Sequence, residues 1–160
     1  MLPRVEIALI PLVSLALIGA GSAPPSLHGG RATYEVRLAG HEEVNNLAGT
    51  AGDMDGSGRV QLTVDLDRKQ VCYDFNVSGL STPLMAHIHR GSAMNNGPSV
   101  VTLFTGPGAD LDRCLAWTPK KLAEIVADPS NFYVNLATTE YPDGAVRGQL
   151  SGNSLALVTR

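Results

Sequence analysis

The sequence predicts an all-β protein: an antiparallel, Greek-key-like β-sandwich of about eight strands with one short helix at about residues 119–127. Three observations lead to this fold class. Apolar and polar residues alternate strictly in several segments, turn sequences such as NNGP and YPDG separate those segments, and only one segment has helical spacing.

The first 23 residues resemble a secretory signal peptide. Arg4 gives a weak positive start, an almost wholly apolar run follows, and Gly21, Ser22 and Ala23 are small residues suited to cleavage. The alternative is a retained membrane anchor, although the run is shorter than the ~20 residues that a bilayer span needs. We expect a signal peptide at 1–23, a flexible lead-in at 24–32 and one domain at 33–158. The protein would then be secreted, extracellular or periplasmic, with no membrane span after cleavage.

The strands follow from the period-2 alternation. In the first three segments, 33–40, 58–66 and 70–79, every second residue is apolar and the residues between are mostly polar or small. Such alternation is typical of strands with one buried face. Further strands are expected at 85–90, 99–104, 113–117, 131–138, 145–151 and 154–158.

One helix interrupts the series of strands. Thr118 is a residue type that can cap it, Pro119 suits its first position, and Leu122, Ile125 and Val126 form one apolar stripe. The sequence DPS, at 128–130, ends it.

Composition and charge limit the function. The net charge is −3 and no Lys/Arg cluster occurs, so nucleic acid is not an expected partner. The two cysteines, Cys72 and Cys114, form an even count behind a signal peptide, and we expect a disulfide between them. The alternative is two free buried thiols.

His87 and His89 lie two residues apart, so on a strand both rings project from one face while Ile88 points to the core. Such a pair can bind zinc or copper if a third ligand joins it. The candidates for that ligand are His28, His41, Glu43 and Asp143. Two alternatives remain: hydrogen bonding to nearby backbone and carboxylates, or a catalytic role.

Three other features suggest sites. Arg147 alternates with core-facing Val146, and its guanidinium can hold a carboxylate, with Glu43 or Glu42 as the expected partner. Asp53 and Asp55 lie in a Gly-rich stretch that suggests a calcium loop, although a turn explains it better. Asn76 begins a formal glycosylation sequon.

Four segments carry a resemblance to a known family. VCYDFNVSGL, AHIHRGSAMNNGPSVVTLF, DPSNFYVNLATTEYPDGAVRGQL and, more loosely, VRLAGHEEV occur in the order seen in the CHRD domain family, over about residues 33–151. The resemblance implies an extracellular β-sandwich without an established enzymatic activity.

The same resemblance bears on three sites. The cysteines fall where similar bacterial members carry a pair, and Arg147 belongs to the family signature. In one segment the chain departs from the family: VNLAT stands where members typically read VNVHT, so Ala137 replaces a histidine. That loss removes an imidazole from the face of the strand that carries Asn135.

We therefore expect a secreted or cell-surface, non-enzymatic binding or structural module, with no cofactor. Its partner would be an unknown extracellular protein, matrix or envelope ligand. No nucleophile elbow or similar catalytic signature occurs. The alternative is a copper- or zinc-binding protein that uses His87 and His89, similar to superoxide dismutase by analogy of fold alone.

Overall fold

A computed structural model describes residues 30–44 and 52–151 of the chain. Its strands are β1 (Arg31–Ala39), β2 (Ser57–Asp65), β3 (Gln70–Ser78), β4 (Pro83–Arg90), β5 (Ser99–Thr105), β6 (Asp112–Ala116), β7 (Phe132–Thr138) and β8 (Val146–Gln149). One α-helix, α1 (Pro119–Ala127), and two short 3-10 turns, η1 (Gly40–Glu42) and η2 (Pro129–Asn131), complete the described elements.

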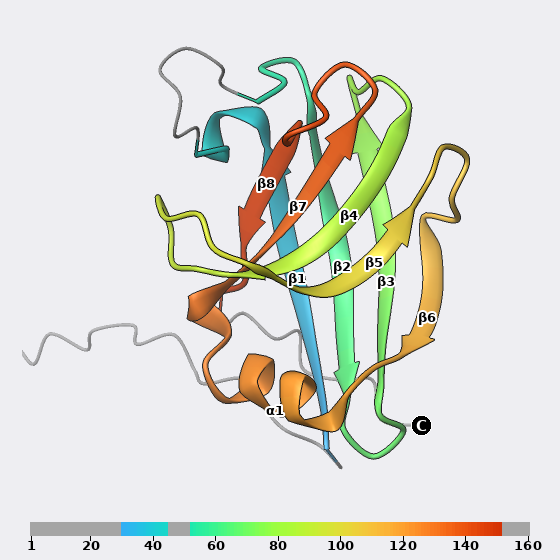
Figure 1. Ribbon diagram of the computed structural model, residues 1–160, viewed down its shortest axis with the longest axis vertical. Helices are drawn as coiled ribbons and strands as arrows, with labels where there is room; N and C mark the ends of the chain where they lie inside the picture. Colours follow the sequence, from blue (N-terminus) through green and yellow to red (C-terminus); the bar gives the residue numbers. More distant parts are fainter. Residues whose placement is uncertain (1–29, 45–51, 152–160) are drawn as a thin grey trace, which may run out of the picture.

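All eight strands belong to one antiparallel sheet in the order β5-β4-β7-β8-β1-β2-β3-β6. The sheet curls so that β4 and β5 lie across β1, β2 and β3 (Figure 1). Phe104 of β5 packs against Tyr73 and Phe75 of β3, with ring centroids 6.1 and 5.8 Å apart. The predicted all-β fold with one short helix is confirmed, and its two layers are the two halves of a single sheet.

The alternation of the sequence becomes the two faces of this sheet. Tyr34 on β1, Leu62 on β2 and Ile88 on β4 are fully buried on the inner face, where they join one continuous core. The predicted inward position of Ile88 is therefore confirmed. Burial of such side chains contributes roughly 1.5–3 kcal/mol each to stability.

Helix α1 covers one end of the curled sheet (Figure 1). Leu122, Ile125 and Val126 are its buried residues, as the apolar stripe predicts, and Pro119 occupies the first turn. The predicted cap is wrong in one respect: Thr118 is the N-cap residue, but its side chain makes no capping hydrogen bond. None of the described helices is long and apolar enough to cross a membrane.

Several predicted boundaries differ from the structure. β1 begins at Arg31, inside the range expected to be a lead-in, and β8 is shorter than the expected 145–151. The expected signal peptide and the expected strand at 154–158 lie outside the described residues.

Strand β7 differs most from expectation, because all seven of its residues are buried. A strand at the surface of a two-layer protein buries every second residue. The outer face of β7 is covered by the chain that follows β1 and by residues 91–98, which we call loop 91–98. Polar side chains on this face are therefore enclosed.

The predicted disulfide is present. Cys72 and Cys114 lie directly opposite each other on β3 and β6 and are joined by a disulfide, and no described cysteine is free. The bond ties the edge strand β6 to the sheet.

Candidate functional site

The strand register assembles a polar cluster on the outer face of β4, β7 and β8. Asn135 of β7 lies opposite His87 on one side and Arg147 on the other. Tyr133, two residues earlier on β7, lies opposite His89. Residues directly opposite in antiparallel strands share a face, so these side chains meet beneath loop 91–98. We call Glu43, His89, Tyr133, Asn135 and Arg147 the outer-face cluster.

Arg147 is 2% exposed and holds loop 91–98 with three hydrogen bonds. Its Nη1 donates to Asn96 Oδ1 (3.0 Å), and its Nη2 donates to the carbonyl oxygens of Ser92 (3.1 Å) and Asn95 (3.0 Å). The carbon at the centre of its guanidinium lies 3.4 Å from the centroid of the Tyr133 ring. Arg147 is thus a buried cation whose hydrogen-bond partners are mostly main-chain carbonyls.

The expected ion pair between Arg147 and Glu43 or Glu42 is not among the salt bridges of the described residues. The reason is geometric: the guanidinium is occupied by loop 91–98, and Glu43 instead accepts a hydrogen bond of 2.6 Å from Asn135 Nδ2. Arg147 still acts on Glu43 through its charge and lowers its pKa.

Glu43 is a carboxyl group in an enclosed position. Burial raises its pKa to about 7, against the opposing effects of the Arg147 charge and the Asn135 hydrogen bond. A Cβ atom added at Gly144 would lie 2.8 Å from Glu43 Oε2 and 2.6 Å from Asn135 Nδ2. Gly144 also has φ +148°, so a glycine there is required both by the backbone and by the close approach to this carboxyl.

His89 is fixed by two contacts. Its Nδ1 lies 2.9 Å from the carbonyl oxygen of Gly97, and because a carbonyl only accepts, Nδ1 carries the proton and Nε2 keeps a lone pair. Its ring stacks on Tyr133 with centroids 5.0 Å apart and planes at 11°. Burial lowers the pKa of His89, the hydrogen bond to Gly97 raises it, and the Arg147 charge lowers it.

Tyr133 lies between a cation and an imidazole. Because β7 runs between β4 and β8, His89 and Arg147 approach its ring from opposite sides. Its hydroxyl accepts a hydrogen bond from the Gly97 amide at 3.3 Å. The stack of Arg147, Tyr133 and His89 therefore contacts loop 91–98 through all three side chains.

Loop 91–98 is tied down at its base and exposed at its tip. Asn96 Nδ2 donates to the carbonyl oxygen of Val44, and Gly91 accepts from Gln149 Nε2 at 2.8 Å. Met94, at the tip, is 77% exposed with φ +66°. Met94 therefore presents an apolar side chain to solvent from a loop whose neighbouring residues are held by hydrogen bonds.

The alternative metal site consists of a histidine pair in the described part of the chain. The ring centroids of His87 and His89 lie 5.6 Å apart. The pKa of His87 is lowered mainly by burial and also by the charge of the neighbouring His89. No group of three or more potential ligands occurs among the described residues. Of the candidate third ligands, His41 contacts Glu42, Glu43 contacts Asn135, Asp143 is exposed, and His28 lies outside the described residues.

The calcium interpretation of Asp53 and Asp55 is not supported by the geometry. Asp53 is 7% exposed, and its Oδ1 accepts hydrogen bonds from the amides of Asp55 (3.2 Å) and Gly56 (3.1 Å). Asp53 thus closes a local turn into β2, which was the preferred interpretation of the sequence.

Sequence reasoning missed Tyr133 and Asn135 as members of the site. The signal was available in FYVNLAT, where a tyrosine and an asparagine occupy alternate positions of one strand. Their importance depends on which strands flank β7, and the pattern of a single strand does not contain that information.

Comparison with known proteins identifies a family for the domain. Residues 34–150 match the family model described as the CHRD domain. Neither a curated protein nor a solved structure matches the chain.

Proposed function

Because the chain belongs to the CHRD domain family, we propose that it is a secreted, non-enzymatic binding module that presents loop 91–98 to an extracellular protein, matrix or envelope ligand. The observation that carries this proposal is how the outer-face cluster is connected. Arg147 and His89 donate hydrogen bonds to loop 91–98, and Tyr133 accepts one from it, so the enclosed polar groups serve to hold a surface loop in place.

The tip of loop 91–98 supports a recognition role. Residues 92–96 are exposed, and Met94 is one of two strongly exposed large apolar side chains in the described part of the chain. A preordered loop loses little conformational entropy when it binds, which favours affinity. Met94 would then act as an apolar anchor in a pocket of the partner.

Two features of the chain support export. The apolar N-terminal segment is typical of a signal peptide, and a structural disulfide is stable in oxidising compartments. Both agree with an extracellular or periplasmic place of action and with a ligand from the matrix or envelope.

The test uses protein recovered from the medium or periplasm of cells that express the full chain. This protein is sedimented with insoluble envelope or matrix material from the same cells. We expect retention of the wild type and a roughly tenfold loss of affinity for Met94→Ser, because one anchor of this kind contributes over ~1 kcal/mol.

Met54→Ser is the matched control, because Met54 is 67% exposed and lies outside loop 91–98. Equal retention of the Met94→Ser and Met54→Ser proteins would exclude loop 91–98 as the recognition element. Absence of the protein from the exported fraction would exclude secretion.

A copper- or zinc-binding function is the second candidate, favoured by the fixed tautomer of His89. The hydrogen bond to Gly97 leaves Nε2 free to coordinate, as is usual for metal-binding histidines. Ala137 lies opposite Met85 on the face that carries His87, so a histidine there would approach the pair.

We expect weak metal affinity in the wild type and stronger affinity in Ala137→His, measured by metal analysis and titration with Cu²⁺ or Zn²⁺. Stoichiometric metal in protein from its native compartment, lost in His87→Ala, would instead establish the metal function. An Ala137→His protein with unchanged affinity would show that position 137 does not complete a site.

A further inference from the structure

A polar groove of about 700 Å³ runs along the outer face of the sheet beside the outer-face cluster. It is formed by β1, β2, β3 and β8, with η1 at its end. Apart from glycine, only Leu38 and Ala39 among its lining residues are apolar. We call it the outer groove, and its polar and charged lining residues are Glu35, Arg37, His41, Glu42, Arg59, Asn76, Ser78 and Gln149.

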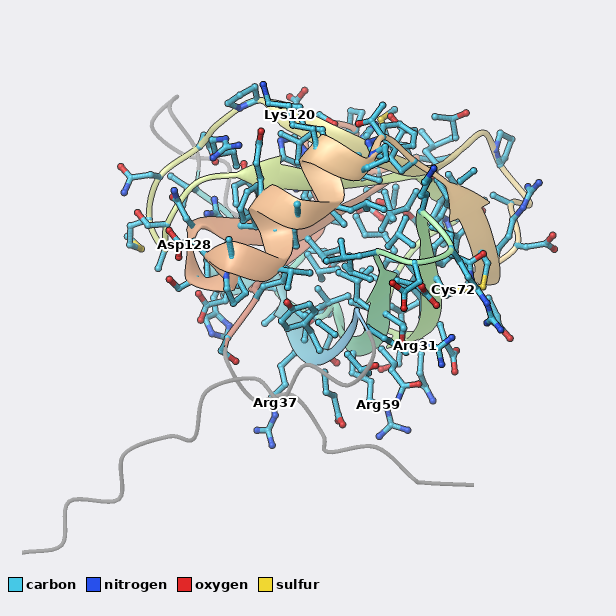
Figure 2. All side chains as sticks on the ribbon, turned by 90° about the horizontal axis from the view of Figure 1, so that it is seen from below. Arg31, Arg37, Arg59, Cys72, Lys120 and Asp128 are labelled. Carbon is cyan, nitrogen blue, oxygen red and sulfur yellow. A yellow bond between two sulfur atoms is a disulfide. The ribbon has the colours of Figure 1, made fainter. Side chains whose placement is uncertain are left out.

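Two arginines lie side by side in the outer groove. Arg37 of β1 and Arg59 of β2 are directly opposite each other in the strand register, and both are exposed. Figure 2 shows that both side chains extend away from the ribbon on the side opposite α1. Like charges at directly opposite positions destabilise an antiparallel pair of strands.

The arginine pair is not neutralised by an ion pair with any described residue. Elsewhere the chain does pair its arginines, as Arg31 with Asp65 at 2.9 Å and Arg90 with Glu124 show. Arg37 and Arg59 are in no such salt bridge. Two adjacent guanidinium groups that no described residue binds match an anion, and the planar fork of arginine matches a carboxylate in particular.

Exposed polar groups line the outer groove beside the arginine pair. Asn76 and Ser78 of β3 are both exposed and both line the groove, so an amide and a hydroxyl are open to a ligand there. Gln149 lines the groove as well, but its Nε2 lies 2.8, 2.7 and 2.9 Å from the carbonyl oxygens of Gly91, Ser130 and Phe132, so its amide is held by the fold.

We propose that the outer groove binds the uronate residues of an acidic polysaccharide. Arg37 and Arg59 hold the carboxylate, while Asn76, Ser78 and Glu35 bind sugar hydroxyls through amide, hydroxyl and carboxylate groups. A protein or peptide partner fits less well, because the groove has few apolar side chains to receive an anchor. This site is separate from the tip of loop 91–98 and does not depend on the function proposed for that loop.

The test is isothermal titration calorimetry of the exported, disulfide-bonded protein with a short oligogalacturonate. A neutral malto-oligosaccharide of the same length and poly-L-glutamate are titrated in parallel. We expect the oligogalacturonate to bind, the neutral sugar not to bind, and poly-L-glutamate to bind at least about tenfold more weakly, because it lacks the hydroxyls.

Variants separate a site from general charge attraction. Arg37→Gln and Arg59→Gln should each weaken binding of the oligogalacturonate by about tenfold or more, since each removes a charged donor. Arg113→Gln makes the same change of charge on β6, outside the outer groove, and should bind like the wild type. Arg37→Gln should keep or raise the melting temperature, because it relieves the repulsion from Arg59.

Three results would overturn the proposal. Failure of the oligogalacturonate to bind excludes the site. If Arg113→Gln weakens binding as much as Arg37→Gln does, the binding is nonspecific charge attraction. Binding of poly-L-glutamate as tight as that of the sugar assigns the groove to acidic peptides instead. Met94→Ser should leave sugar binding unchanged, so failure of the loop proposal and failure of this one are distinguishable.

Discussion

Replacing Arg147 by alanine tests the energetic role of the outer-face cluster. The change removes three hydrogen bonds to loop 91–98 and the stack on Tyr133 at 3.4 Å. It also leaves the carbonyl oxygens of Ser92 and Asn95 without their donors. It also leaves a cavity, because the Arg147 side chain is packed in the protein and is only 2% exposed.

The magnitude follows from these losses. A net hydrogen bond to a charged group contributes about 1.5–3 kcal/mol, and a desolvated cation–π contact about 2 kcal/mol. These terms do not add, because burying the guanidinium itself carries a desolvation penalty of several kcal/mol. We expect Arg147→Ala to lower the free energy of unfolding by about 3 kcal/mol, which for a domain of this size lowers Tm by roughly 10 °C.

Urea unfolding followed by tryptophan fluorescence measures this change, with Arg113→Ala as the control because Arg113 is exposed. The control should lie within about 0.5 kcal/mol of the wild type. Arg147→Lys should recover only part of the loss, because an ammonium group lacks the planar fork and the stacking surface of arginine. If Arg147→Ala unfolds at the same urea concentration as Arg113→Ala, the buried hydrogen bonds of Arg147 do not stabilise the fold.

Two further predictions concern the disulfide and the buried carboxyl group. The bond between Cys72 and Cys114 closes a loop with a sequence separation of 42, so a double serine variant should be less stable by about 4 kcal/mol in urea unfolding, and unfolded, unreduced protein should show no free thiol. Glu43 has a pKa raised by burial to about 7, so the native state holds a proton that the unfolded state loses near the ordinary glutamate pKa of 4.5. The wild type should therefore lose stability relative to Glu43→Gln as the pH rises from 4.5 to 7, and a stability difference that does not change with pH in urea titrations would contradict this.

The strands and the helix of the described residues could be predicted from the sequence because the patterns that indicate them are local. Alternation placed Tyr34, Leu62 and Ile88 on the inner face, and the stripe with Pro119 at its start placed α1. Period-2 and period-3.6 patterns depend only on neighbouring residues, so one chain without structural data reveals them.

The partners of Arg147 could not be predicted in the same way. A carboxylate was the natural partner for a signature arginine, yet the acceptors are main-chain carbonyls of Ser92 and Asn95 and the side chain of Asn96. Every residue has a carbonyl, so no sequence pattern marks which ones will accept. The pairing depends on β8 lying beside β7 with loop 91–98 folded over both, which is a property of the sheet order.

Burial of both faces of β7 escaped prediction for a related reason. A strand covered by a loop has the same alternation as one open to solvent, and here Asn135 is covered by Glu43, which lies 92 residues earlier in the chain. Only the assembled fold brings the two together.

Hydrogen–deuterium exchange of the Gly97 amide tests most directly whether the outer-face cluster holds loop 91–98 in place. That amide donates to the Tyr133 hydroxyl at 3.3 Å, and Tyr133→Phe removes the acceptor while keeping the ring between Arg147 and His89. Slow exchange at Gly97 in the wild type, and clearly faster exchange in Tyr133→Phe, is the result that we predict. Exchange at Gly97 in the wild type as fast as at Gly108, in the exposed turn between β5 and β6, would contradict it.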